Sequence, residues 1–277
     1  MERERLRIVR LHPALNGNCE GEHPHFRPQP GGQLVCAPFA QGGGDRPGDP
    51  GVLEQPPLLK FAVRRDNQDA LGGLSPLAAG LAGSGRPLVI SGATIVTPGR
   101  AATERDELIA TGPVAARIAN MRAALAAAAG GVRSCLVMLP RSVHGQGERH
   151  GFVPQLIAMA RTKGVSGYIG DGASRWPAVH VTDAATLYRL AVEQAPAGAV
   201  LYAVGEEGVP VREIADAIGR HLNLPARSLP AAEYEGMLVP LLSTDMPASS
   251  TITQELLGWK PAGPGLIEDI EQGHYFS

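Results

Sequence analysis

Two histidine side chains are placed where proton transfer could be catalysed. His144 lies in a glycine-flanked loop, just before Gly145 and Gly147, and loops at the carboxyl ends of strands are where open α/β sheets bind ligands. Because an imidazole changes charge near neutral pH, His144 is the leading candidate for a general acid and base, with a plain surface loop as an equally weighted alternative. His180 alternates with two valines, which indicates a strand, so its side chain faces either a pocket or, as the favoured alternative, a structural hydrogen-bond partner.

Ser91 ends an apolar run and precedes Gly92. Its hydroxyl can hold a carbonyl or hydroxyl oxygen of a ligand, although a serine before a glycine is equally typical of a turn.

The three cysteines match neither a disulfide framework nor a zinc site, so we expect no metal and a reducing environment. Cys135, within an apolar run, is expected to be an inert core thiol.

The elements that must position these side chains begin only after a long irregular stretch. From Pro13 to Pro57, nine prolines and nine glycines fall in 45 residues, which interrupts helices and strands alike. We therefore expect residues 1–57 to be irregular and disordered. Neither of two early glycine clusters, one around Gly17 and Gly21 and one at residues 42–44, has the strand and helix that a phosphate-binding turn requires.

Beyond Leu58, short apolar runs alternate with amphipathic stretches, which is typical of an α/β fold with a largely parallel sheet. Asp183 is expected to cap the helix that follows it. The pattern predicts strands at 87–91, 136–139, 168–169, 179–181 and 199–204, and helices at 114–125, 152–159, 183–191, 209–222, 231–238, 251–256 and 266–270.

The net charge and the hydropathy of the sequence limit the classes of ligand and the cellular location to be expected. The 277 residues carry a formal net charge of -2, which disfavours nucleic acid and anionic membranes and favours a small-molecule substrate. No apolar run reaches the length of a membrane span and Met1 to Arg10 contains no signal-peptide core, so a cytoplasmic protein is expected. The sequence leaves open whether the protein forms a homodimer.

Four segments, in order, resemble motifs of one enzyme family. Residues 139–147 resemble RP-x-x-VYGPG, which borders the nicotinamide and substrate there, and residues 170–183 resemble GDG…RDYVHVDDV almost position for position. Residues 209–214 are similar to the start of a substrate-lobe helix, and residues 257–261 to the motif LGWKP. These are motifs of the extended short-chain dehydrogenases/reductases (SDRs), the NAD-dependent epimerase/dehydratase family, and the resemblance covers roughly residues 85 to 275.

The resemblance implies a Rossmann-like, mostly parallel sheet that is incomplete at its N-terminal side and carries a small C-terminal substrate lobe. It assigns residues 58–150 to the remnant of the nucleotide-binding domain, and residues 151–277 to the substrate lobe and last strands. It also implies NAD or NADP as cofactor, and oxidation, reduction or epimerisation of a small hydroxy or keto substrate. Residues 176–180 and 272–276 look like those of an atypical bacterial subgroup of SDR oxidoreductases.

The resemblance also implies roles for individual residues. Ser91 matches the active-site serine, and our hypothesis is that Ser91 holds the substrate oxygen while His144 exchanges the proton. Arg175 matches a region that binds anionic substrate groups, although an exposed, solvated arginine is equally consistent. Trp176 either stacks on a substrate ring or covers the lobe junction. The implied contacts are Pro140 and Val143 with the cofactor, and Arg175, Trp176 and His180 with the substrate.

The chain departs from the family in two respects. No Gly-x-x-Gly-x-x-Gly turn occurs near the start, and the positions of the catalytic Tyr and Lys fall on Arg117 and Met121, neither of which can exchange a proton near neutral pH. Two alternatives to an enzyme follow. The chain is either a non-catalytic binding or regulatory protein with this fold, or a truncated or frameshifted inactive member in which residues 1–57 replace a lost Rossmann start.

Overall fold

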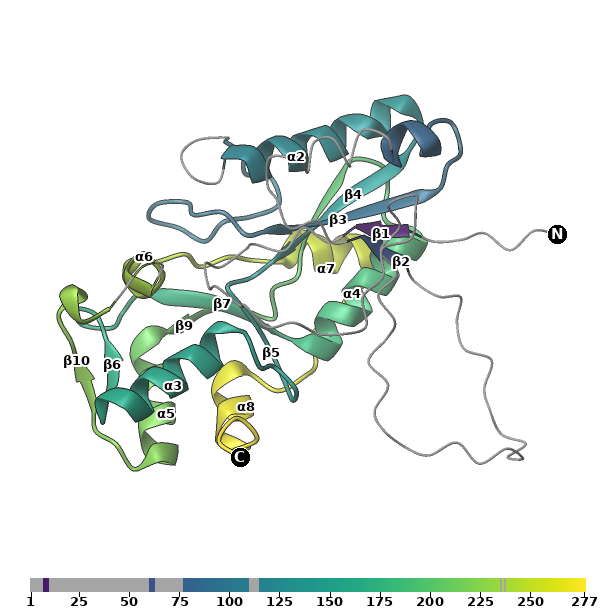
Figure 1. Cartoon of the computed structure of the whole chain (residues 1–277). Coiled ribbons are helices and arrows are strands. Elements are labelled where there is room, and N and C mark those ends of the chain that lie inside the picture. The colour runs from purple at the N-terminus through teal and green to yellow at the C-terminus, as the bar shows by residue number, and fades with distance from the viewer. Residues whose placement is uncertain (1–6, 10–59, 63–76, 110–114, 235, 237) are drawn as a thin grey trace, which may run out of the picture. The chain divides into compact units, whose positions relative to one another are not determined.

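The computed structural model describes residues 7–9, 60–62, 77–109, 115–234, 236 and 238–277 (Figure 1). The chain forms two compact units. Unit 1 comprises Met1–Ser91, Ala110–Cys135 and Pro196–Gly198, and unit 2 comprises Gly92–Ile109, Leu136–Ala195 and Ala199–Ser277. The chain passes from one unit to the other several times along its length. The expected domain boundary at residue 150 stays a prediction.

One sheet of the structure has five strands. Its order is β2-β1-β3-β4-β8, and β1 (Arg7–Val9) pairs in parallel with both β2 (Lys60–Ala62) and β3 (Pro87–Ala93). β4 (Arg133–Leu139) and β8 (Ala199–Tyr202) complete it. The central residues of β3 and β4 are buried, as is typical of apolar strands covered on both faces. The α/β class and these three later strands are therefore confirmed, with slightly different ends.

The expectation that residues 1–57 are irregular throughout is wrong at Arg7–Val9. Ile8 and Val9 are β-branched residues that suit a strand between two partners, and the dense prolines and glycines begin only at Pro13. The rest of this segment, including both glycine clusters, lies outside the described residues.

Helix α2 (Ala115–Ala126) connects β3 to β4 in unit 1, the crossover that a parallel pair of strands requires. Ile118 and Met121 are buried as the apolar spacing predicts, but Ala124 and not Leu125 completes the buried side. A 3-10 turn, η2 (Ala127–Gly130), follows. In β4, Cys135 is buried and burial raises the pKa of its thiol to about 12, which confirms an inert core thiol.

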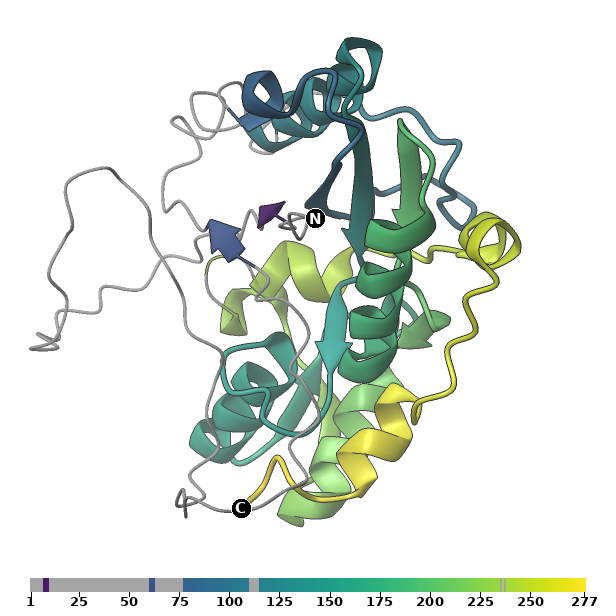
Figure 2. The same cartoon turned by 90° about the vertical axis from the view of Figure 1, so that its right-hand side faces the viewer.

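A second, three-stranded sheet belongs to unit 2 and carries the residues near His144. Its order is β5 (Ser142–His144), β7 (Arg175–His180) and β9 (Glu206–Pro210), with β5 parallel and β9 antiparallel to β7. The register places His144 opposite His180. In Figure 2 the teal arrow of β5 lies between α3 (Phe152–Lys163) and α4 (Val181–Gln194), and both helices contact it.

Three helices of unit 2 pack together beside this sheet. α3, α5 (Val211–Leu222) and α8 (Leu266–Glu271) are neighbours, with α5 in contact with both of the others (Figure 1). The apolar spacing of the sequence predicts part of their buried faces, because Leu156, Ile214 and Ile218 are buried whereas Phe152 and Met159 are only partly buried. The core between them includes Leu156, Ile157, Ile214, Ile218, Leu266 and Ile270.

The start of α4 differs from the prediction, because Asp183 does not cap this helix. The N-cap residue is His180, whose ring accepts a hydrogen bond from the backbone N–H of Thr182. Asp183 lies in the first turn, and its Oδ2 instead accepts the backbone N–H groups of Ala262 (3.1 Å) and Gly263 (2.8 Å). A loop 79 and 80 residues further along the chain, which the local pattern does not reveal, occupies the carboxylate.

The prediction of one helix at 231–238 is also wrong, because two separate elements occur in this region. A 3-10 turn, η3 (Ala231–Glu233), ends at Tyr234, which has extended backbone angles, and α6 (Leu238–Ser243) starts separately. Gly236 between them has a φ of 56°, in the left-handed region that ends a helix. The remaining elements are β6 (Ser166–Tyr168), which pairs in parallel with β10 (Ala226–Ser228), and α7 (Thr251–Leu257).

Among the described residues, no helix combines the length and the apolar character needed to cross a membrane.

Candidate functional site

His144 lies at the end of β5 and forms a hydrogen-bonded pair with Asp269 of α8. The distance from Nδ1 of His144 to Oδ2 of Asp269 is 3.0 Å, and both side chains are 1% exposed. Burial lowers the pKa of His144 despite the attraction of Asp269. The imidazole is therefore neutral at neutral pH, with its proton on Nδ1, where the Asp269 carboxylate accepts it.

The second ring nitrogen of His144 is the chemically available one. Nε2 is buried and has no hydrogen-bond partner among the described residues. A neutral imidazole held by a carboxylate at Nδ1 presents a lone pair at Nε2, the arrangement that serves a general base. The ring of His180 lies edge-on to that of His144, with centroids 5.5 Å apart, and Nδ1 of His180 bonds the Thr182 hydroxyl at 2.7 Å.

Tyr275, near the C-terminus, joins this pair to the loop after β5. Its hydroxyl lies 3.1 Å from Oδ2 of Asp269 and 2.8 Å from Oε2 of Glu148, and it accepts the backbone N–H of Gly145 at 3.0 Å. Burial raises the pKa of Tyr275, so the phenol keeps its proton. The tail around it is held by the stacking of Phe276 on His221 and by a hydrogen bond from Arg161 to the Phe276 carbonyl.

Glu148 is the half-buried residue of an otherwise exposed loop from residue 146 to residue 150. Burial raises the pKa of Glu148 to about 7, the hydrogen bond from Tyr275 opposes this rise, and the charge of Asp269 adds to it. Its carboxyl group occupies the space beside Gly151, where a Cβ atom would lie 1.4 Å from Oε1 of Glu148. Gly151 thus leaves room for the carboxyl group.

Gly145 brings the same loop close to the start of α4. Its φ is 142°, and a Cβ atom there would lie 2.7 Å from Cγ1 of Val181 and 3.1 Å from Nε2 of His180. Only glycine allows this backbone path together with the approach to His180.

Three further predicted residues lie in strands or directly after one. Ser91 is buried within β3. Pro140 is buried directly after β4, and Val143 is partly buried in β5. Two hydroxyls that the sequence analysis does not single out, Thr94 Oγ1 and Ser142 Oγ, are buried and lack a hydrogen-bond partner among the described residues. Such unpaired groups are expected where a polar ligand binds.

Arg175 is paired with an acid of its own unit. Its guanidinium group donates to both carboxylate oxygens of Asp245, at 2.9 and 2.7 Å, and its backbone N–H donates to the same carboxylate at 2.8 Å. Both side chains are 45% exposed. The fork that would bind an anionic substrate is therefore occupied in this structure, and its predicted role stays a prediction.

Replacing Arg175 with alanine should lower the free energy of unfolding by no more than about 1 kcal/mol, because exposed ion pairs contribute little. Asp245→Ala should cost more than Arg175→Ala, since it also removes the acceptor of the Arg175 backbone N–H. Urea denaturation of both variants measures the difference. Equal losses, or a loss above about 2 kcal/mol for Arg175→Ala, would contradict this assignment of the pair.

Trp176 is completely buried, with its ring packed edge-on against Phe152 at 5.9 Å between centroids. Its Nε1 donates to the Leu241 carbonyl at 3.0 Å, and the Arg141 guanidinium lies over the ring, 5.6 Å from its centroid. Burial lowers the pKa of Arg141 to about 10. Trp176 is thus placed as a core residue, and its contact with a substrate stays a prediction.

The positions that match the family's Tyr and Lys lie on α2. Met121 is 1% exposed and belongs to the core. Arg117 is partly buried, and burial lowers the pKa of its guanidinium group. The described part of unit 1 therefore provides no acid or base at either position.

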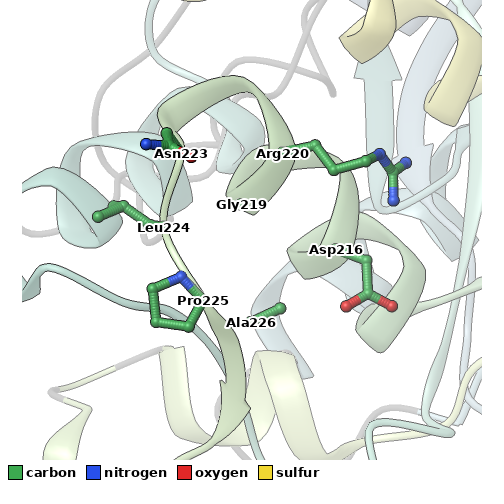
Figure 3. Close-up of a pocket in the computed structure, with 7 residues that line it drawn as sticks. All are labelled: Asp216, Gly219, Arg220, Asn223, Leu224, Pro225 and Ala226. Carbon is green, nitrogen blue, oxygen red and sulfur yellow. The ribbon is translucent and has the colours of Figure 1, made fainter.

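A shallow concavity of about 420 Å³ lies elsewhere in unit 2, at the C-terminal end of α5 (Figure 3). It is lined by residues of α5 and the following turn, among them Asp216, Arg220 and Asn223, and it contains no predicted site residue. Over the described ranges, no group of three or more His, Cys, Asp and Glu side chains is arranged to hold a metal ion.

Sequence reasoning misses three members of the network, which are Asp269, Tyr275 and Glu148. For Asp269 a signal exists, because it occupies an inward position of α8 between Leu266 and Ile270, and a carboxylate on a buried face needs a partner. Tyr275 belongs to the terminal segment that resembles a subgroup signature, but no local pattern indicates its hydroxyl contacts. Glu148 stands in a polar loop and gives no signal.

The parallel sheet with its connecting helix, and a polar site after the carboxyl ends of the strands, define a Rossmann-like α/β protein. Residues 85–205 match the model of the NAD dependent epimerase/dehydratase family. An uncharacterized protein of Schizosaccharomyces pombe is 44% identical over 201 residues, which are 71% of this chain and 67% of that protein. The chain belongs to the NAD-dependent epimerase/dehydratase family.

A second relative and two solved structures are also similar to this chain. An uncharacterized protein of Saccharomyces cerevisiae is 38% identical over 198 residues, 70% of this chain and 66% of that protein, so the matched part spans about two thirds of these relatives. The structure resembles dTDP-glucose 4,6-dehydratase from Bacillus anthracis in complex with NAD, with a TM-score of 0.60 and 14% identity over 75% of this chain and 67% of that one. The structure also resembles a UDP-galactose 4-epimerase, with a TM-score of 0.57 and 19% identity over 74% of this chain and 67% of that one. The two relatives compared by sequence, from Schizosaccharomyces pombe and Saccharomyces cerevisiae, are fungal, so membership of a bacterial subgroup stays a prediction.

Proposed function

We propose that the protein is an NAD(P)-dependent oxidoreductase or epimerase of the extended SDR type that acts on a small hydroxy or keto substrate, with His144 as its acid and base. The observation that carries this proposal is the state of His144. Asp269 holds its Nδ1 proton, and Nε2 is left with a free lone pair. Family membership supplies the class of reaction.

The described residues fit the nicotinamide end of a dinucleotide better than its pyrophosphate. The unpaired hydroxyls of Thr94 and Ser142, with Pro140 and Val143, follow the carboxyl ends of the strands and are the groups that would face the nicotinamide and substrate. Residues that could hold the pyrophosphate lie outside the described ones. When bound, the nicotinamide would supply the hydride chemistry, while Nε2 of His144 removes or returns the proton of the substrate oxygen.

A second candidate function rests on Met121. A buried thioether at the position of the family's Lys favours a binding or regulatory protein that keeps the fold without hydride transfer. Under either function, we propose a small-molecule ligand and a cytoplasmic location.

Incubation of the full chain with UDP-glucose, UDP-galactose, dTDP-glucose and simple hydroxy acids, each with NAD⁺ or NADP⁺, separates the two functions. Proton NMR of the substrate detects oxidation, epimerisation and dehydration alike. We expect at least one substrate to be converted, and only when a dinucleotide is present. If no substrate is converted although the protein binds the dinucleotide, the enzyme proposal is wrong and the binding function is supported.

A further inference from the structure

Unit 2 contains a continuous hydrogen-bonded chain from the buried His144 to the exposed loop of Glu148. Its steps are the 3.0 Å contact from His144 to Asp269, the 3.1 Å contact from Asp269 to the Tyr275 hydroxyl, and the 2.8 Å contact from that hydroxyl to Glu148. The chain starts at a side chain that is 1% exposed and ends in a loop whose other residues face solvent.

Counting the protons of this hydrogen-bonded chain shows that every contact is a hydrogen bond only if one of the two carboxyl groups carries a proton. The Tyr275 hydroxyl has a single proton but lies within reach of two carboxyl groups, and its oxygen also accepts the N–H of Gly145. If Tyr275 donates to Asp269, the contact with Glu148 needs a proton on Glu148. If it donates to Glu148, two unprotonated oxygens of Tyr275 and Asp269 face each other unless Asp269 carries the proton. One proton is therefore shared by the two carboxyl groups.

Glu148 is the better holder of this proton. Asp269 is the acceptor for His144 as well as for Tyr275, so its oxygen is stabilised as an anion by two donors. Among the described residues, the Glu148 carboxyl group is hydrogen-bonded only to Tyr275. Burial acts in the same direction, raising the pKa of Glu148 to about 7.

We propose that Glu148, Tyr275 and Asp269 form a proton relay that connects His144 to solvent, with Glu148 as its protonated outer end. This inference rests on the proposed role of His144 as acid and base.

Glu148 releases its proton to water. Nε2 then takes the substrate hydroxyl proton as that O–H bond breaks, and Nδ1 passes its proton to Asp269. Asp269 protonates the Tyr275 oxygen while Tyr275 protonates Glu148. In total one proton moves from substrate to water. Glu148, Tyr275 and Asp269 regain their starting protons, and His144 again carries one proton, now on Nε2.

Several charged or titratable groups face this relay and set its electrostatics. His274 of the tail lies 3.8 Å from Oδ2 of Asp269. His180 of β7 lies edge-on to His144, and the charge of Glu206 on β9 acts on His144. These three groups act on the inner half of the relay, while the charge of Asp269 and the hydroxyl of Tyr275 act on Glu148.

The relay can be tested by NMR titration of the full chain without cofactor or substrate, using ¹³C-labelled glutamate carboxyls and ¹⁵N-labelled histidines. Glu148, assigned with the variant Glu148→Gln, should titrate at about pH 7, far above the value of about 4.3 for an exposed glutamate. His144 should show an inflection at the same pH, because a change at Glu148 alters the hydrogen bond that Asp269 receives.

Tyr275→Phe removes the connecting hydroxyl but leaves the pair of His144 and Asp269, so the inflection of His144 near pH 7 should disappear. Gly151→Ala is a second variant, which keeps all four relay groups but displaces the Glu148 carboxyl; it should return Glu148 towards its ordinary titration and also abolish the inflection. Titration of Glu148 near pH 4, or an inflection that survives in Tyr275→Phe or Gly151→Ala, would overturn the relay. Because no substrate is present, failure of the relay is distinct from failure of the proposed function.

Discussion

Replacing Asp269 with alanine is expected to lower the free energy of unfolding by about 3 kcal/mol, because two buried donors lose their acceptor at once. Nδ1–H of His144 and the Tyr275 hydroxyl both point at Oδ2 of this residue, which is 1% exposed. Leaving buried polar groups unpaired costs far more than the net contribution of the hydrogen bonds themselves. The loss should be visible as a lower midpoint in urea denaturation with an unchanged slope.

Two further variants make this result specific. Asp269→Asn keeps one oxygen acceptor and should lose distinctly less stability than Asp269→Ala. Glu271→Ala removes an acid from the same helix that pairs with Arg220 and His221 at the surface, and should cost at most about 1 kcal/mol. A cost below about 1 kcal/mol for Asp269→Ala would show that the network does not hold α8 against β5.

Replacing His144 with asparagine is expected to reduce turnover by about 10² to 10⁴-fold with little loss of stability, the range typical of a lost general acid or base. The amide nitrogen of asparagine can take the place of Nδ1 and donate to Asp269, whereas nothing takes the place of Nε2. The variant therefore removes the proposed chemistry while keeping the buried hydrogen bond. Dinucleotide binding should be unchanged.

The measurement is substrate conversion by wild type and variant at equal protein concentration. His150→Asn is the matched control, since His150 lies in the exposed loop and its side chain is outside the network. Undiminished turnover in His144→Asn, with full activity in the control, would remove His144 from the mechanism. His144→Ala, which also breaks the bond to Asp269, should add instability to the loss of turnover.

The sequence predicts the parts of this molecule that depend on local periodicity. The apolar strands and the helices around Ile118, Leu156 and Ile214 follow the expected spacing, because burial of one helix face or of a whole strand leaves a regular pattern. His144 is expected in a glycine-flanked loop after the strand at 136–139, but it is the last residue of β5, a short strand that its local sequence does not indicate.

The partners of His144 could not be predicted, because they come from distant parts of the chain. Asp269 is 125 residues from His144, and Tyr275 is 130 residues from Gly145. The same cause explains why the prediction that Asp183 caps α4 is wrong. Asp183 has the residue type of an N-cap, but its carboxylate accepts backbone hydrogen bonds from a distant loop. Local propensity identifies which groups need partners, while the fold decides which partners they find.

A measurement of dinucleotide binding tests the proposed NAD(P)-dependent function most directly. Isothermal titration of the full chain with NAD⁺ and with NADP⁺ should show saturable binding of at least one of them near one site per chain, and His144→Asn should bind it equally well. Absence of binding by the folded wild-type protein to both dinucleotides would contradict the proposed function.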